Sequence, residues 1–213
     1  MKVLKFGGTS VANAQNMQRT IAIIQEKSRH HRVVVAISAL SGVTDLLLKA
    51  GRLAALKDVA FRSVLKDIEH KHFDTILQLL PESHQSNILD HCKQHLNTLR
   101  TLLEGCFLLG EMTSRTSDSI VSYGELLSSY ILAKAFELTA PDSTFKDSRE
   151  LIVTNDVFGH ASVDFAASNK AIRSYFDKQQ QRVTIVPGFI AATPDGQTTT
   201  LGRGGSDYTA AIF

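Results

Sequence analysis

The sequence lacks the features of secreted and membrane proteins. Its two cysteines, Cys92 and Cys106, are too few for a disulfide framework and favour a reducing compartment. No apolar run approaches the roughly 20 residues that cross a bilayer, and Gly7 and Gly8 come too early for a signal peptide to precede them. These absences predict a cytoplasmic protein without membrane association.

An excess of one charge is also missing. Lys and Arg number 23 against 21 Asp and Glu, and no long block gathers like charges. The balance indicates neither a nucleic-acid-binding surface nor an acidic tail, so we expect no nucleic-acid partner. What the chain does have is 43% apolar residues in a length of 213, which is enough for a substantial core.

One short segment resembles a metal-binding motif. His91 and His95 are spaced to share a helix face, with Cys92 between them. No second ligand pair follows at the spacing of a zinc site. We therefore predict no metal, and expect a solvated helix face with Cys92 turned towards the core.

The first 38 residues alternate between strand and helix patterns. Residues 2–6 (KVLKF) predict a buried strand, and residues 32–38 (RVVVAIS) are β-branched and apolar, as in strands covered on both faces. Between them one helix face gathers the apolar residues Ala14, Met17, Ile21 and Ile24. This order predicts a βαβ unit with a right-handed crossover, and hence an α/β fold with a mainly parallel sheet.

The next segment is almost entirely helical in pattern. Two apolar stripes run along it: Phe61, Leu65, Ile68, His72, Ile76 and Leu79, then Ile88, Cys92, Leu99 and Leu103 before Gly105. Pro81 separates the stripes, which predicts a helical hairpin over about 57–104 inserted into the α/β domain. We find no chemistry in these helices, and packing is their simplest role.

After Thr113 the pattern is mixed again. A polar stretch runs into a helix in which Glu125 is an early residue, and a short strand is expected at about 145–153. A helix over 162–178 and one strand over 182–193 (RVTIVPGFIAAT) follow.

The last segment predicts a hairpin and a helix. The turn TPDG at 193–196 should lead back through QTTTL. Ser206 and Asp207 suit a helix start, but the sequence stops about two turns later without a stop signal. We therefore expect the chain to be truncated inside a helix at residue 213, as part of a longer protein.

Two glycine clusters carry the chemical signal. In KFGGTS (5–10), Gly7 and Gly8 follow a strand, where backbone N–H groups can approach a phosphate. Lys5 can reach the same anion, and Thr9 and Ser10 add hydroxyl donors. Alone this motif is weak, because a glycine pair after a strand is often only a tight turn.

The second cluster, GRGGSD (202–207), strengthens the signal. Arg203 can bind a carboxylate through two hydrogen bonds, and Asp207 can hold an ammonium group. With Glu125 and Thr44, these residues fall at loops after strands or at helix starts, where open α/β sheets bind ligands. The charges suit a small zwitterion beside a phosphate. The simpler alternatives are a local pair of Arg203 with Asp207 and a Glu125 on the helix surface.

Six segments, in order and across nearly the whole chain, resemble aspartokinases. They are KFGGTSV (5–11), SALSGVTD (38–45), SYGELLS (122–128), TNDVFGHA (154–161), PGFIAATPDG (187–196) and TTTLGRGGSDYTAA (198–211). The last is long and highly specific, whereas the helical segment matches only in position. The resemblance implies the amino-acid kinase fold, a three-layer αβα sandwich with a mainly parallel sheet and an inserted helical hairpin.

The resemblance implies phosphoryl transfer from ATP, with Mg²⁺, to the β-carboxylate of L-aspartate, the first step towards lysine, threonine and methionine. Lys5 and Asp207 would be catalytic, the first neutralising phosphoryl charge and the second orienting the reacting groups. The implied phosphate loop comprises Lys5, Gly7, Gly8, Thr9 and Ser10. The implied aspartate pocket comprises Ser38, Thr44, Glu125, Phe189, Arg203 and Ser206, with Arg203 on a carboxylate and Glu125 on the α-ammonium. No general base is required, because the β-carboxylate is already ionised at neutral pH.

Aspartokinases are longer than this chain, with most of the adenine-binding segment and a pair of regulatory domains beyond it. We therefore expect the chain alone to bind ATP weakly and turn over poorly, and the longer protein to form a homo-oligomer. Some members continue into a homoserine dehydrogenase, and these residues do not distinguish the two forms. A non-catalytic amino-acid or anion-binding module stays open, although it would not need both Lys5 and Asp207. A dinucleotide-binding oxidoreductase is disfavoured, since FGGTSV lacks the G-x-G-x-x-G spacing.

Overall fold

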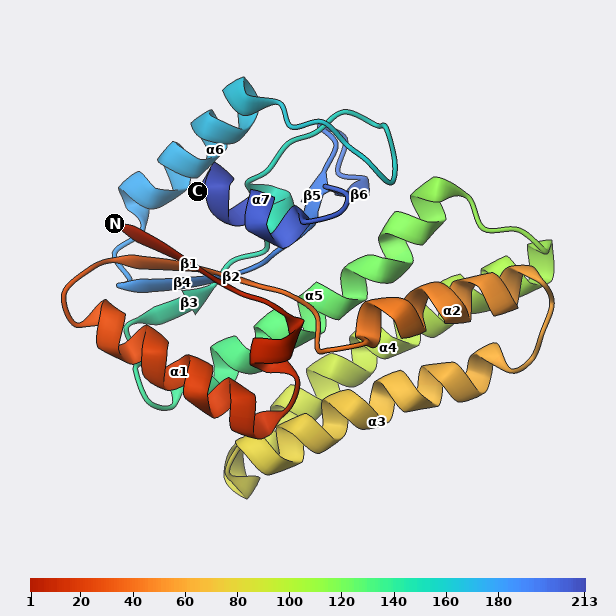
Figure 1. Ribbon diagram of the computed structural model, residues 1–213, viewed down its shortest axis with the longest axis horizontal. Coiled ribbons are helices and arrows are strands. Elements are labelled where there is room, and N and C mark those ends of the chain that lie inside the picture. The colour runs from red at the N-terminus through yellow and green to blue at the C-terminus, as the bar shows by residue number, and fades with distance from the viewer.

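The computed structural model describes residues 1–213 and is built around a four-stranded parallel sheet (Figure 1). Its strands lie in the order β1 (Lys2–Phe6), β2 (Val33–Ile37), β4 (Val183–Pro187) and β3 (Ser143–Phe145). All five residues of β2 and of β4 are buried, as parallel strands covered on both faces should be. The predicted parallel sheet and its first two strands are confirmed. The burial expected for residues 2–6 is wrong, because β1 is the edge strand, with Lys2 exposed and its other residues only half-buried.

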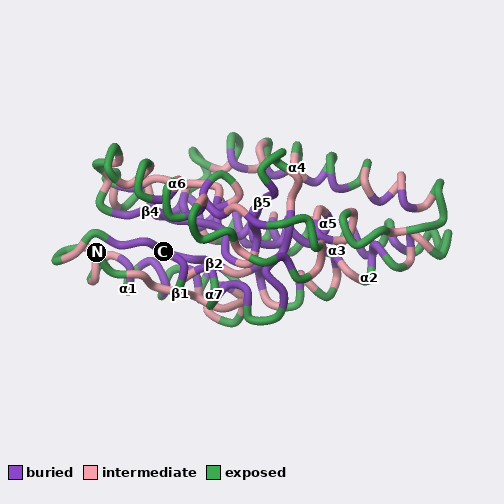
Figure 2. Tube along the Cα trace, turned by 90° about the horizontal axis from the view of Figure 1, so that it is seen from above, coloured by how far each residue is buried: buried purple, intermediate pink, exposed green.

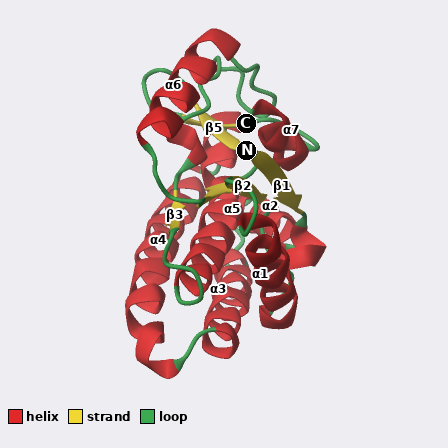
Figure 3. Cartoon of the chain, turned by 90° about the vertical axis from the view of Figure 1, so that its left-hand side faces the viewer, coloured by secondary structure: helices red, strands yellow, loops and turns green.

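Helices cover both faces of this sheet (Figure 3). Val33, Val35 and Ile37 point to the face covered by α1 (Ala14–Ser28) and α5 (Ser114–Glu137). Val34 and Ala36 point the other way, towards α6 (Phe165–Lys178) and α7 (Gly205–Ile212). Alternate side chains of β2 therefore contribute to the hydrophobic cores on the two faces of the sheet. The three-layer αβα arrangement is confirmed.

A bundle of long helices lies beside the sheet. It contains α2 (Val43–Ala55), α3 (Phe61–Leu79), α4 (Glu82–Leu109) and α5, whose inward faces form the buried part of the trace in Figure 2. The stripes predicted from the sequence form this interior, although Leu79 is only half-buried. No helix of the chain is long and apolar enough to cross a membrane.

The hairpin of α3 and α4 has different ends from those expected. It spans residues 61–109 rather than about 57–104, because α4 continues through Gly105. Gly105 lies within this helix, with open space where a side chain would lie. The helix ends at Gly110, whose left-handed φ of 79° is the usual conformation of a glycine that terminates a helix.

The segment that resembles a metal motif packs against α5. Cys92 is buried, as expected, but His91 and His95 are half-buried rather than solvated. His91 stacks on Tyr130 with ring centroids 3.8 Å apart, and the Nε2 atoms of the two histidines are 3.1 Å apart.

The helix that carries Glu125 starts earlier than expected. Thr113 caps α5 by accepting a hydrogen bond from the backbone N–H of Thr116 at 3.1 Å, so the polar stretch forms the first turns of the helix. Glu125 is thus a central residue of α5. Strand β3 is also shorter and earlier than the predicted 145–153. Helix α6, capped by Asp164, begins at Phe165, three residues after the expected start at 162.

The single strand predicted over 182–193 is wrong. Strand β4 ends at Pro187, and β5 (Ile190–Ala192) belongs to a separate two-stranded sheet, where it pairs antiparallel with β6 (Thr198–Thr200). A Cβ at Gly188 would lie 2.8 Å from the Cβ of Ser206, so the chain turns where it passes the start of α7. The hairpin predicted through TPDG is confirmed.

Candidate active site

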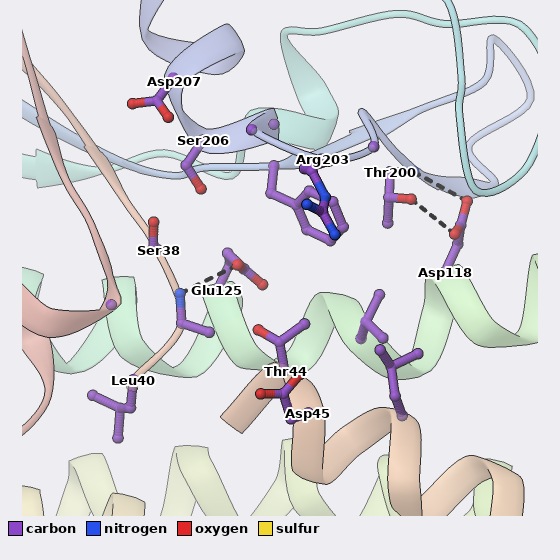
Figure 4. A pocket seen from close by; sticks show the side chains of 18 of the residues that line it. Ser38, Leu40, Thr44, Asp45, Asp118, Glu125, Thr200, Arg203, Ser206 and Asp207 are labelled. Carbon is purple, nitrogen blue, oxygen red and sulfur yellow. Dashed lines mark hydrogen bonds between the residues drawn. The ribbon is translucent and has the colours of Figure 1, made fainter. Parts of the chain in front are cut away.

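A polar crevice of about 810 Å³ opens at the carboxyl ends of β1 and β2, bordered by α5 and the start of α7 (Figure 4). In parallel α/β sheets this is the edge where ligands bind. The crevice collects most of the site residues expected from the sequence: Lys5, Gly8, Thr9, Ser38, Thr44, Glu125, Phe189, Arg203, Ser206 and Asp207. Gly7 and Ser10 do not line it.

The first glycine loop brings Lys5 to Asp207. The Lys5 Nζ and Asp207 Oδ1 atoms are 3.0 Å apart, although β1 and α7 lie at opposite ends of the chain. A Cβ at Gly8 would lie 3.1 Å from the carbonyl oxygen of Ala39, so the loops after β1 and β2 approach closely here. The alternative local pair of Arg203 with Asp207 does not form.

Gly7 and Ser10 have other positions. A Cβ at Gly7 would lie 3.4 Å from Lys5 Nζ, so Gly7 borders the ammonium group behind the crevice. The Ser10 carbonyl accepts a hydrogen bond from the Thr20 hydroxyl at 2.9 Å, and the residue lines a separate hollow beside α1. Ser10 therefore faces away from the crevice.

Glu125 lies in the crevice wall and is only 4% exposed, so the alternative of a helix-surface carboxylate is wrong. Its Oε1 accepts a hydrogen bond from the backbone N–H of Ala39 at 3.2 Å, whereas its Oε2 has no partner. Burial raises the pKa of this carboxyl to about 8, and the hydrogen bond from Ala39 only partly opposes it. A buried acceptor with one unused oxygen can take a hydrogen-bonding cation.

Arg203 projects into the crevice from the second glycine loop (Figure 4). It is flanked by Gly202 and Gly204, whose φ angles of 72° and 76° lie in the left-handed region that favours glycine. The guanidinium makes no hydrogen bond or ion pair with the rest of the chain, so its donors are free. Ser206 and Phe189 also line the crevice.

Several lining residues were not anticipated from the sequence. They are Asp45, Ser117, Asp118, His160 and Thr200. One available signal was spacing, because Asp118 precedes Glu125 by seven residues and two helical turns place both on one face. The other was the motif TNDVFGHA, which carries His160.

The fold and crevice define an α/β protein with a polar crevice at the carboxyl ends of its strands and glycine loops around it. The chain belongs to the amino acid kinase family, whose model matches residues 1–213.

Similar proteins are aspartokinases, which confirms the resemblance. The chain is 33% identical to bifunctional aspartokinase/homoserine dehydrogenase 1 of Arabidopsis thaliana, covering 99% of this chain and 23% of that protein. It is 31% identical to lysine-sensitive aspartokinase 3 of Escherichia coli, covering 99% of this chain and 45% of that protein. The chain therefore spans less than half of the length of these relatives, from 23% to 45%.

Solved structures of an aspartokinase are also similar to the chain. The crystal structure of E. coli aspartokinase III in complex with aspartate and ADP superimposes with a TM-score of 0.88 at 32% identity, over 100% of this chain and 46% of that one. The complex of the same enzyme with lysine and aspartate gives a TM-score of 0.89.

Proposed function

We propose that the chain is the aspartate-binding and phosphate-loop part of an aspartokinase. The longer protein would transfer the γ-phosphoryl group of ATP to the β-carboxylate of L-aspartate, at the start of lysine, threonine and methionine synthesis. The similarity to aspartokinases over the whole chain supports this reaction. The crevice adds a chemical reason of its own.

The observation that carries the proposal is the pairing of an unpartnered carboxyl and an unpartnered cation in one crevice. Glu125 Oε2 has no partner in its buried position, and the Arg203 guanidinium has none in its loop. An α-amino acid with an acidic side chain offers an ammonium group for the first and a carboxylate for the second. Ser38, Thr44, Phe189 and Ser206 would complete the pocket.

Lys5 would serve the transfer step. Its ammonium lies at the strand end beside Gly7 and Gly8, where it can offset the repulsion between the attacking carboxylate and the phosphoryl group. Asp207, 3.0 Å away, would fix the direction of the ammonium. The nucleophile is already ionised, so the site needs positioning and positive charge rather than a base.

ATP would supply the phosphoryl group, with Mg²⁺ neutralising its phosphates. The chain has no group of three His, Cys, Asp or Glu side chains arranged to hold a metal ion. This fits Mg²⁺, which is commonly bound through substrate phosphates, water and only one or two carboxylates. Asp207 and Asp45 are exposed carboxylates at the crevice that could provide such a ligand.

Calorimetry of the chain with L-aspartate tests the proposal. We expect Arg203→Ala to weaken binding by about 100-fold, because a charge-assisted pair of hydrogen bonds is lost. Arg173→Ala removes an exposed arginine of α6 outside the crevice and serves as the matched control. A folded chain that does not bind L-aspartate, or binds it equally well without Arg203, would contradict the assignment.

A further inference from the structure

Asp118 joins three separate segments at the wall of the crevice. It is 2% exposed and lies on α5. Its Oδ2 accepts hydrogen bonds from the backbone N–H groups of Gly159 at 2.9 Å and Thr200 at 3.1 Å. Its Oδ1 accepts one from the Thr200 hydroxyl at 2.9 Å (Figure 4). One side chain thus links α5 to the loop before α6 and to the end of β6.

Both contacts of Asp118 lie close to Gly202. A Cβ at Gly202 would be 2.7 Å from Nδ1 of His160, so the loop that contains Gly159 and His160 lies directly against Gly202. Thr200 precedes Gly202 by two residues in the chain. Ala161 donates its N–H to the carbonyl of Thr200 at 3.0 Å, which holds the two segments together.

The Arg203 guanidinium has no partner, so the backbone on either side of it fixes its position. Towards α7, Gly205 donates its N–H to the carbonyl of Gly202 at 3.0 Å, and towards β6, Leu201 donates its N–H to the carbonyl of Phe189 at 2.9 Å. Both flanking glycines are in left-handed conformations that resist only weakly any change of backbone direction. The position of the guanidinium therefore depends in part on where β6 ends. Asp118 is the side chain that anchors this end to α5, the helix that also carries Glu125.

We propose that Asp118 is a positioning residue for the substrate: its hydrogen bonds to Gly159 and Thr200 hold the Arg203 loop at the distance from Glu125 that the ligand requires. The identity of that ligand rests on the proposed function, whereas the effect on the loop does not. Asp118 acts as a hydrogen-bond acceptor. Asp118→Asn can therefore replace it, with the amide oxygen accepting both N–H groups and the amide nitrogen donating to the Thr200 hydroxyl.

Hydrogen exchange of the free chain tests the effect on the loop. In Asp118→Ala we expect the Gly159 and Thr200 amides to exchange about tenfold faster or more, with α3 and α4 unchanged. Asp118→Asn should stay close to wild type. Ser117→Ala alters the neighbouring crevice residue, whose side chain makes no hydrogen bond, and serves as the control. Unchanged exchange of both amides in Asp118→Ala would overturn the proposal.

A double-mutant cycle on L-aspartate binding tests the link to Arg203. We expect Asp118→Ala to weaken binding about tenfold in the wild-type background and to add almost nothing to Arg203→Ala. Asp118→Asn should weaken it less than about threefold. Equal, additive losses in both backgrounds would overturn the proposal, because Asp118 would then act independently of Arg203.

Two cases need a separate decision: an Asp118→Ala variant that does not fold, and a wild-type chain that does not bind L-aspartate. If Asp118→Ala does not fold, Thr200→Val replaces it in the cycle, since it removes only the hydroxyl bonded to Oδ1 and keeps the side-chain volume. A loss of about threefold that disappears without Arg203 would support the proposal, and an additive loss would overturn it. If the wild-type chain does not bind L-aspartate, the proposed function fails and hydrogen exchange alone decides the role of Asp118.

Discussion

The crevice and the helical hairpin each bury one ionisable side chain that leaves an atom without a partner: Glu125 Oε2 and His72 Nε2. Both residues are central in long helices, and both use their other polar atom. Glu125 Oε1 accepts from Ala39, and His72 Nδ1 donates to the carbonyl of Ile68 at 2.7 Å. The free oxygen of Glu125 adjoins a polar crevice, whereas the free nitrogen of His72 is enclosed by the hydrophobic core.

An unpartnered polar atom has different consequences in these two places. Beside a cavity it can be satisfied by a ligand, so its cost in the free protein contributes to selectivity. In a closed core it only costs stability. The pKa shifts are opposite in direction and share one cause, since burial raises the pKa of Glu125 to about 8 and lowers that of His72 to about 4.

The two groups therefore change the free energy of unfolding with pH in opposite directions. The unfolded chain binds a proton on His72 more readily, so this residue lowers the free energy of unfolding as the pH falls from about 6.5 to about 4. Glu125 contributes most to stability below its unfolded pKa of about 4.5. That contribution is lost as the pH rises through about 8.

The largest expected difference between the crevice and the helical hairpin concerns the lysine and arginine of their ion pairs. We expect Lys5→Ala to lower phosphoryl transfer in the active protein by about 10²–10³-fold, because a fixed positive charge at the reacting centre is lost. The product acyl phosphate can be trapped with hydroxylamine and quantified. Arg62→Ala breaks the hairpin pair with Glu104, whose Nε–Oε1 distance is 2.9 Å, and should leave turnover unchanged. A loss below tenfold for Lys5→Ala would place it outside the transfer step.

The second largest effect is expected in the pH dependence of aspartate binding. Glu125 must ionise to hold an ammonium group, so affinity should rise by about 50-fold between pH 6 and pH 8, with release of about one proton. Calorimetry in buffers of different ionisation enthalpy measures both quantities. Glu125→Gln should flatten the profile, whereas His72→Leu should leave it intact. A flat wild-type profile would be inconsistent with this role for Glu125.

Substitution of two helical glycines measures how tightly the crevice and the hairpin are packed. A Cβ at Gly124 would lie 2.8 Å from that of Ala39, so Gly124→Ala should push the Ala39 loop from α5 and cost about 1–3 kcal/mol of stability. Gly105→Ala meets no atom within 4 Å and should stabilise α4 by about 0.5–1 kcal/mol. Denaturant titration measures both changes. Equal effects of the two substitutions would refute the distinction.

His72→Leu gives the smallest effect at neutral pH. Removing the unpartnered nitrogen should raise the free energy of unfolding by about 1 kcal/mol at pH 7. The gain should grow at pH 5, because the variant no longer gains a proton on unfolding. Denaturant titrations at the two pH values, with the exposed His70→Leu as control, measure it. A gain that shrinks at acidic pH would contradict the buried, neutral state of His72.

Local patterns predicted the elements that a single periodicity defines. The apolar run of β2 and the buried stripe of α1 were recognisable because burial repeats along each segment. The break between β4 and β5 was not, because Gly188 and Phe189 turn the chain only where it meets Ser206 of α7. Phe189 even adopts a left-handed φ of 66°, which no propensity favours.

The site residues also fall into two groups: those that a local motif predicts and those that only the fold brings together. Lys5 and Arg203 could be proposed from their own glycine motifs, since each chemistry is local. The deep burial of Glu125 could not, because the polar residues before it resembled a loop until Thr113 was seen to cap the helix. Asp118 was missed because its partners Gly159 and Thr200 lie 41 and 82 residues away.

Helix α5 belongs to both regions, since it contacts α2 and α4 on one side and β3, β4 and β6 on the other. Asp118 and Glu125 therefore stand on the same rigid element that closes the core of the bundle. Any ligand that binds only the folded crevice lowers the population of every state in which α5 is detached. Occupancy of the crevice will thus protect the α3–α4 hairpin from every opening that also detaches α5, although no residue of the hairpin lines the crevice.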